Sequence, residues 1–270
     1  MSVIVLLGIG VFTGLTTVLF GFGGGFVTVP VIVWADAGLG PAAVHVAVAT
    51  SSVVMVVNAC VATAATDRTI LRHLRGSAGL MLLLAAGGAA GTIAAQHAPG
   101  PVTQWGFVTY LVITIADLLL RPGFFRPRAD ARSRPDGNTA IPAVLGVPIG
   151  AVAAFLGVGG SVMTVPLLRR SGRDMRTATS LANPLTLAIA VPAMAIFLTG
   201  GTAPGGRAAV FLSGSVDLGA AAALLAGALP VIITLRRRRP RIPDSVYSWS
   251  YLALLVLVTI AMVIAALRRG

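Results

Sequence analysis

Residues 10–30 read GVFTGLTTVLFGFGGGFVTVP, and residues 146–166 read GVPIGAVAAFLGVGGSVMTVP. The two stretches align without a gap, and nine of the 21 positions are identical, including an ordered Gly-x-Gly-Gly-x-x-x-Thr-Val-Pro block. A second match follows, in which Ala49-Thr50-Ser51 corresponds to Ala178-Thr179-Ser180. Two ordered matches, at separations of 136 and 129 residues, indicate a duplicated unit. We therefore interpret the chain as two copies of one unit.

The composition of the chain indicates a helical membrane protein. Of the 270 residues, 56% are hydrophobic and 10% are charged, whereas a soluble domain is about a quarter charged. The mean hydropathy of +0.92 excludes a disordered chain, because disorder requires low hydrophobicity. Membrane helices need about 20 apolar residues, and none of the apolar runs alternates like a membrane β-strand. Six runs qualify as spans: 42–65, 78–96, 102–120, 177–199, 216–235 and 246–267.

The N-terminal sequence and the cysteine content are also those expected of a helical membrane protein. No basic residue precedes Arg68, so the positive region of a cleavable signal peptide is lacking, and we expect no lipid anchor. The single cysteine, Cys60, excludes an intramolecular disulfide and a zinc site of several cysteines. We therefore expect the apolar runs to be mature transmembrane structure.

The distribution of arginine predicts the topology. All 20 basic residues are Arg and the net charge is +12, which in a soluble protein would suggest nucleic acid. Seventeen of them lie within 68–75, 121–134, 169–176 and 236–241, and cytoplasmic loops are the ones that collect Arg. These four segments share one side only if each glycine-rich stretch enters the membrane and turns back. A single crossing would put nine Arg on the wrong side. We expect cytoplasmic Arg-rich loops, a cell-membrane location and no nucleic-acid partner.

This topology predicts an all-α polytopic membrane protein with two inverted repeats, the architecture of many secondary transporters. Each repeat has a glycine-broken pair of short helices and three transmembrane helices. Re-entrant helices are tolerated only where they line a cavity or are buried in protein. The first repeat, 1–120, has short helices at 3–20 and 26–35 and spans at 42–65, 78–96 and 102–120. A cytoplasmic linker, 121–139, leads to the second repeat, 140–270, with short helices at 140–156 and 162–168 and spans at 177–199, 216–235 and 246–267.

The two glycine-rich breaks form the candidate anion site. Glycine lets the backbone approach a ligand, and a helix that starts after a break has free N–H groups that attract anions. Breaks from inverted halves would meet near the midplane, where hydroxyl and amide side chains of the next helix add uncharged hydrogen-bonding groups. The candidate substrate-binding residues are Gly23, Gly24, Gly25, Thr28, Thr50, Ser51, Ser52, Asn58, Gly159, Gly160, Ser161, Thr164, Thr179, Ser180 and Asn183.

Structural interpretations compete with these assignments. The hydroxyl groups can equally bond a carbonyl of their own or a neighbouring helix. For the isolated small-residue pairs we favour tight helix packing over substrate lining; the pairs are Gly10/Gly14, Gly87/Gly91 and Gly146/Gly150.

The ionisable residues of the apolar runs also have structural interpretations. Asp117 is expected to pair with Arg121, and Asp217 to cap a helix. The three histidines are scattered without metal-ligand spacing, although a proton-coupling role for His45 is a weaker alternative. No nucleophile elbow, P-loop or His-Glu-x-x-His motif occurs. We therefore expect no enzymatic activity, no metal and no cofactor.

The paired glycine blocks are each followed by an Ala-Thr-Ser helix, and the element Gly214-Ser215-Val216-Asp217 precedes a late span. In these features the chain resembles the TauE/SafE family of membrane transport proteins over nearly its whole length. The first half lacks a counterpart of the last element. The resemblance implies a secondary transporter that exports sulfite, an organosulfonate or a related sulfur oxyanion. Its partners would be a small anionic substrate and the lipid bilayer, with a coupling proton or cation and a homo-oligomer left open. Alternatives are a passive anion channel, a family member for another small solute, and a membrane enzyme or structural protein.

The predicted topology can be tested by cysteine labelling at positions near 38 and 172. A membrane-impermeant thiol reagent added to intact cells should label a cysteine near 38 and should not reach one near 172. Labelling of the site near 172 from outside would contradict the re-entrant topology.

Overall fold

The computed structural model describes residues 3–35, 42–121, 123–125, 141–200, 212–213, 215–238 and 242–267 of the chain. The elements of the first half are α1 (Val3–Phe20), α2 (Gly25–Ala35), α3 (Ala42–Ala64), α4 (Arg68–Leu71), the 3₁₀ turn η2 (Arg72–Leu74), α5 (Ala78–His97) and α6 (Gly100–Leu120). Those of the second half are η4 (Ala143–Leu145), α7 (Gly146–Leu156), α8 (Ser161–Arg170), α9 (Met175–Thr199), β1 (Leu212–Ser213), β2 (Val216–Asp217), α10 (Leu218–Arg238) and α11 (Asp244–Leu267).

The expected all-α polytopic membrane fold is confirmed. Among the described residues, six helices are long and apolar enough to cross a membrane, namely α3, α5, α6, α9, α10 and α11. A two-stranded antiparallel ribbon of β1 and β2 precedes α10. Apart from Arg121 and 123–125, the expected linker at 121–139 lies outside the described residues.

Two expected helices begin later than the sequence suggested. The span expected at 216–235 opens with β2, because Asp217 N donates to Thr50 Oγ1 over 2.9 Å and the Asp217 carboxylate accepts from Ala220 N, so that α10 begins at Leu218. The helix expected over 140–156 is divided into η4 and α7. Pro148 has no N–H for the carbonyl four residues earlier, so a regular α-helix does not extend back before Gly146.

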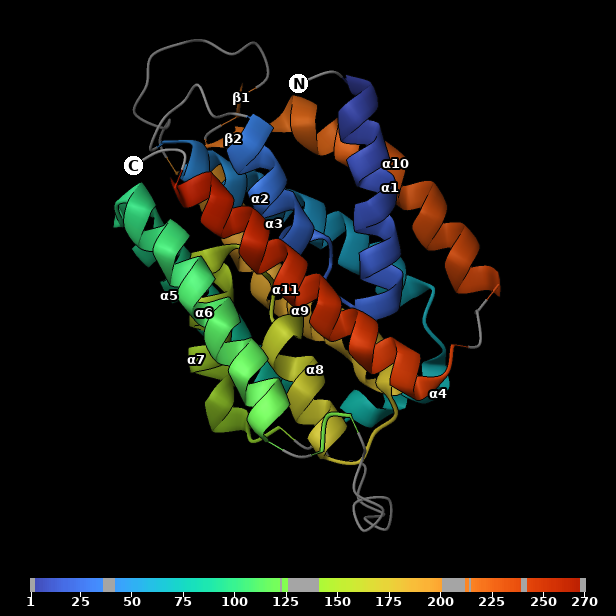
Figure 1. The fold of residues 1–270 in the computed structure, drawn as a ribbon. Helices are drawn as coiled ribbons and strands as arrows, with labels where there is room; N and C mark the ends of the chain where they lie inside the picture. The colour runs from blue at the N-terminus through green and yellow to red at the C-terminus, as the bar shows by residue number, and fades with distance from the viewer. Residues whose placement is uncertain are drawn as a thin grey trace.

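Both glycine-rich stretches turn the chain back on itself. Gly21, Gly23 and Gly24 follow α1 with positive φ, and Gly157 and Gly159 follow α7 in the same way. This backbone region suits glycine and ends a helix. In Figure 1, α1 starts at the upper end of the molecule and α2 returns to it, whereas α7 starts near the lower end and α8 returns there. The two pairs of short helices thus approach the centre from opposite ends.

The Arg-rich segments gather at one end of the bundle. In Figure 1 the lower end holds α4, the last turn of α8 and the start of α11, while the start of α1, β1, β2 and the end of α11 lie at the upper end. We call the lower end the Arg-rich end, because the described residues Arg68–Arg75 and Arg169–Arg176 lie there. This common location is what the predicted topology requires.

Glycine allows each broken helix to pack on a span of the other half. A Cβ on Gly14 of α1 would lie 2.5 Å from the Ala228 carbonyl oxygen of α10. In the other half, a Cβ on Gly150 of α7 would collide with the Leu84 carbonyl oxygen of α5, and one on Gly91 of α5 with the Ala151 carbonyl oxygen. The packing interpretation of the isolated glycine pairs is therefore confirmed.

The helix-packing role of glycine can be tested on one helix. Gly14→Ala should lower the melting temperature of the detergent-purified protein by several degrees, because its Cβ meets backbone that cannot move aside. Gly8→Ala is the matched control, since a Cβ on Gly8 of the same helix meets nothing within 4 Å. It should leave the melting temperature unchanged or raise it, because alanine favours the helix by about 1 kcal/mol. Equal effects of the two changes would argue against the packing role.

Candidate functional site

The two glycine-rich breaks meet in the middle of the molecule. A Cβ on Gly25 would lie 2.8 Å from the Gly157 carbonyl oxygen, and one on Gly159 would lie 3.4 Å from the Phe22 carbonyl oxygen. Gly23 and Gly159 both approach Met55 of α3 and Thr186 of α9. These two residues lie near the midpoints of Ala42–Ala64 and Met175–Thr199. The breaks therefore meet halfway along the two central spans.

Each break also packs against the Thr-Ser helix of the opposite half. A Cβ on Gly21 would collide with the Thr179 carbonyl oxygen of α9. A Cβ on Gly157 would lie 3.1 Å from Val48 Cα of α3. Ser51 Oγ is 2.7 Å from the Val48 carbonyl of its own helix and 3.1 Å from the Gly157 carbonyl, and it donates its one proton between them. The central region is thus shared by the two halves, so a ligand bound there would contact both.

Several buried polar atoms beside the breaks have no hydrogen-bond partner among the described residues. The Asn58 amide lies against Gly24, and neither its nitrogen nor its oxygen is bonded. The other such atoms are Thr13 Oγ1, Ser161 Oγ, Thr164 Oγ1, Asn183 Oδ1 and Thr186 Oγ1. An unpaired buried polar group costs about 1–3 kcal/mol. Six residues with this cost at one place are consistent with a polar ligand or water that completes their bonds.

The backbone adds donors to the same region. Val27 N and Thr28 N bond to the Gly24 carbonyl, and Met163 N and Thr164 N bond to the Gly160 carbonyl. The preceding N–H groups at the starts of α2 and α8 therefore have no partner within their own helices. Helix N-termini carry partial positive charge. Two of them face the centre from opposite ends of the molecule, which suits an anion.

Other predicted site residues use their hydroxyl groups for structural bonds. Thr28 donates to the Gly24 carbonyl and Ser52 to the Ala49 carbonyl. Thr50 Oγ1 accepts from Asp217 N and so anchors β2. Thr179 donates to the Arg176 carbonyl. At the centre the structure brings together Gly23, Gly24, Gly25, Ser51, Asn58, Gly159, Gly160, Ser161, Thr164 and Asn183, whereas the side chains of Thr28, Thr50, Ser52 and Thr179 are bonded elsewhere.

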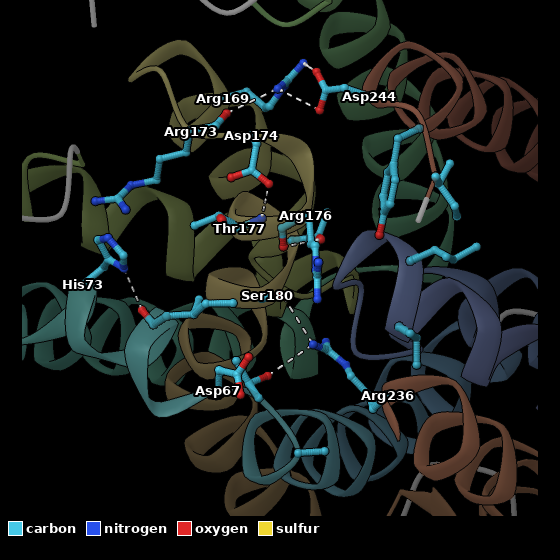
Figure 2. Close-up of a pocket in the computed structure, with 18 of the residues that line it drawn as sticks. Asp67, His73, Arg169, Arg173, Asp174, Arg176, Thr177, Ser180, Arg236 and Asp244 are labelled. Carbon is cyan, nitrogen blue, oxygen red and sulfur yellow. Dashed lines mark hydrogen bonds and ion pairs between the residues drawn. The ribbon is translucent and has the colours of Figure 1, made fainter. Parts of the chain in front are cut away.

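A cavity of about 710 Å³ lies at the Arg-rich end and reaches the predicted site residues Thr179 and Ser180. Figure 2 shows side chains of α9, α10 and the segment after α3 around it. Its ionisable lining residues are Asp67, His73, Arg169, Arg173, Asp174, Arg176, Arg236 and Asp244. Burial lowers the pKa of the Arg173 guanidinium, and the neighbouring Asp174 carboxylate opposes that shift. The lining thus mixes both signs of charge, with Arg more frequent than Asp.

Arg169 forms an ion pair in which the guanidinium is fully buried and the Asp244 carboxylate is partly exposed. Its side chain is 0% exposed, and its guanidinium donates to both carboxylate oxygens of Asp244, over 3.2 and 2.6 Å. Its Nε donates to the Phe124 carbonyl over 3.0 Å, and Asp244 also accepts from Met175 N. The sequence interpretation of Arg169 as a loop charge was incomplete. Through Asp244, which also bonds Met175 N, Arg169 links the end of α8 to the starts of α9 and α11.

The structure adds central residues that the sequence interpretation missed. Thr186 and Thr13 lie beside the breaks with unpaired hydroxyl groups. Thr186 could have been found, because Ser180, Asn183 and Thr186 recur at a spacing of three residues, which follows one strip of a helix. Arg236 looked like one residue of a topological arginine run, yet its NH1 donates to Thr66 Oγ1 and Ser180 Oγ at the cavity wall.

The ionisable residues have the expected structural roles. Asp117 pairs with Arg121 over 3.2 Å and, in addition, with Arg170 over 2.7 Å. Asp217 caps α10 by accepting from Ala220 N over 2.9 Å. Within the described residues, no group of three or more His, Cys, Asp or Glu side chains could hold a metal ion.

The Arg169–Asp244 pair leads to a stability prediction. Asp244→Asn should destabilise the protein by about 3 kcal/mol, because it leaves a buried guanidinium without its counter-charge. Asp117→Asn is the control, since Arg121 and Arg170 remain partly exposed, and it should cost less than about 1 kcal/mol. Denaturant unfolding in detergent measures both. A larger effect at Asp117 would contradict the account.

One of three comparisons with known proteins finds a match. The family model described as sulfite exporter TauE/SafE matches residues 6–262. Neither a comparison with curated proteins nor one with solved structures finds a match. The matched region includes both glycine-rich breaks, all six candidate spans except the last residues of α11, and the cavity. The chain is thus an integral membrane protein that belongs to the TauE/SafE sulfite exporter family.

Proposed function

We propose that the protein is a secondary transporter, working as an exporter, of a small sulfur oxyanion such as sulfite or an organosulfonate. The substrate binds where the two glycine-rich breaks meet, and access alternates between the two ends of the molecule. The family match supports the class of substrate. The breaks supply backbone donors, and Asn58 and Thr186 supply uncharged side-chain donors. Asn183 Nδ2 donates to the Thr179 carbonyl over 3.3 Å and would have to leave it to reach the anion.

The observation that carries this proposal is the set of unpaired polar groups where two helix N-termini converge. An oxyanion has several acceptor oxygens, and the unpaired donors there include the Asn58 amide nitrogen. Neutral donors bind a monoanion without placing a fixed charge in the membrane, which would be costly. Preformed donors at two helix N-termini are a recurrent solution for anion binding.

The way the halves pack supports alternating access. Each broken helix lies on a span of the opposite half, and the contacts at Gly14 and Gly150 are backbone to backbone. Such contacts join α1 to α10 and α7 to α5, so the unit that moves around the central site is a bundle with helices from both halves, as inverted-repeat transporters allow. The cavity gives the site an approach from the Arg-rich end, while the residues at the breaks are buried.

Transport can be measured with purified protein in proteoliposomes. Radiolabelled sulfite should enter in a saturable manner, and unlabelled sulfite or a short sulfonate on the opposite side should accelerate the exchange. Single-channel currents without saturation would instead favour the passive channel. Transport of another solute with no response to sulfur anions would contradict the proposed substrate class.

The location of the site can be tested with two kinds of variant. Bulky residues at Gly24 and Gly160 should abolish uptake, because a Cβ there already approaches the Asn58 amide nitrogen at 2.6 Å and Ile189 Cδ1 at 2.5 Å. Since such changes can also disturb folding, Asn58→Leu with Asn183→Leu provides the sharper test. This pair removes three unpaired polar atoms at the cost of one bond of 3.3 Å from Asn183 Nδ2 to the Thr179 carbonyl, so the melting temperature should be retained or rise while transport falls at least ten-fold.

Thr114→Val serves as the matched control for the two asparagine changes. Its hydroxyl donates to the Tyr110 carbonyl within α6 and does not line the breaks. Uptake by this variant should equal that of the wild type. Wild-type uptake after both asparagine changes, or after both glycine changes, would exclude the breaks as the substrate site.

A further inference from the structure

The two halves differ in charge at one corresponding position. A Cβ on Gly10 of α1 would collide with the Leu224 carbonyl oxygen, and the corresponding Gly146 of α7 faces the Leu80 carbonyl oxygen. Gly14 faces Ala228 and Gly150 faces Leu84 in the same manner. In both cases the contacted residues of α10 and α5 are 144 positions apart. This correspondence aligns α5 with α10 independently of sequence similarity.

On this alignment the counterpart of Arg236 is Thr92. Thr92 is fully buried, and its hydroxyl donates to the Gly88 carbonyl of its own helix over 2.7 Å. Arg236 instead lines the cavity at the Arg-rich end, where its NH1 donates to Thr66 Oγ1 over 3.2 Å and to Ser180 Oγ over 3.3 Å. Arg236 thus places a positive charge at the Arg-rich end, whereas Thr92, at the equivalent position of α5, is neutral.

The surroundings of Arg236 favour an anion. Four Arg and three Asp line the cavity. Asp244 is occupied by the buried Arg169, and Asp174 caps α9 by accepting from Thr177 N over 3.3 Å. The third carboxylate, Asp67, lies on the same side of the cavity as Arg236, so the four guanidinium groups exceed the carboxylates by one. Figure 2 shows the side chains of Arg176 and Arg236 extending into the middle of the cavity from α9 and α10. Positive charge on the walls of a cavity concentrates anions within it.

A strip of polar side chains on α9 connects this cavity with the breaks. Ser180 lies at the cavity wall, Asn183 is one turn further along, and Thr186 lies beside Gly23 and Gly159. Asn183 Oδ1 and Thr186 Oγ1 have no partner among the described residues. From Ser180 to Thr186 the rise along the helix is about 9 Å. An anion held at Ser180 is therefore about two turns from the central site.

We propose that Arg236 and Ser180, with Thr66 as a positioning residue and Arg176 facing them, form a second anion-binding site at the Arg-rich end. This site binds the sulfite ion or the sulfonate head group before the anion reaches the breaks. The sulfur chemistry of the ligand rests on the proposed function, whereas the site itself rests on the cavity. A volume of about 710 Å³ exceeds what sulfite needs, so a sulfonate with a short organic tail also fits.

The test is equilibrium binding of sulfite and of 2-hydroxyethanesulfonate to detergent-purified protein by titration calorimetry. Arg236→Gln should raise the dissociation constant of both anions about ten-fold or more, because a charge-assisted hydrogen bond is lost. Arg236→Lys should restore part of the affinity. Arg121→Gln is the control, because Arg121 is an exposed residue paired with Asp117 and does not line the cavity. This variant should bind both anions with the affinity of the wild type.

A second measurement separates this site from a structural role of Arg236. Raising the concentration of an inert salt should weaken binding to the wild type more steeply than binding to Arg236→Gln. Salt screens the attraction between the anion and the Arg236 guanidinium, which only the wild type has. Ser180→Ala, which keeps the cation, should weaken binding several-fold with the same salt dependence as the wild type. If Arg236→Gln does not fold, the Ser180→Ala and Arg176→Gln variants decide the matter.

The outcomes distinguish the site from the proposed function. Unchanged affinity in Arg236→Gln, or in both Ser180→Ala and Arg176→Gln, would overturn the second site even if the wild type transports sulfite. If the wild type binds phosphate but no sulfur anion, and Arg236→Gln weakens that binding, the site stands and the proposed substrate class fails. Absence of binding of sulfite, 2-hydroxyethanesulfonate and phosphate to the wild type would also overturn the site.

Discussion

The structure depends on close contact between glycine residues of one half and backbone carbonyl groups of the other. Side chains larger than hydrogen at Gly14 or Gly150 would meet the backbone of α10 or α5, so these helices could not approach. Because lipid tails are as apolar as leucine, helix association in a membrane relies on such close packing rather than on the hydrophobic effect. The contact holds the two broken helices in place and thereby brings their glycine-rich breaks together.

The meeting of the breaks explains why polar groups can remain unpaired in the interior. Asn58 and Asn183 come from equivalent spans, and each lies about one turn from the level of Met55 and Thr186 on the side of the Arg-rich end. The unpaired groups lower the free energy of unfolding, and the surrounding helix packing offsets this loss, as is common at functional sites. The charged groups are kept apart from this centre: Arg169, Asp244 and Arg236 lie at the cavity and not at the breaks. This separation suits a site that must bind an anion and release it.

Much of this arrangement could be predicted from the sequence. The repeat at residues 10–30 and 146–166 indicated the two breaks, and the positions of the arginines indicated that each break turns back. The central glycines came from the same repeat, and Asn58 and Asn183 were selected as polar residues of the helix that follows each break. The roles of individual hydroxyl groups did not follow, because Thr50 and Ser51 are neighbours in sequence but bond to Asp217 and Gly157, which are far away in the chain. Arg169 and Arg236 were missed for a related reason, since a run of arginines does not reveal which members turn inward.

The central claim is that the substrate binds where the two glycine-rich breaks meet. Selenite has the shape and charge of sulfite, and selenium scatters anomalously, so a crystal structure of the protein with selenite tests the claim most directly. The account predicts an anomalous peak within hydrogen-bonding distance of Asn58 or Thr186, between Gly23 and Gly159. A peak confined to the cavity beside Arg236, or no peak at a saturating concentration of selenite, would contradict it.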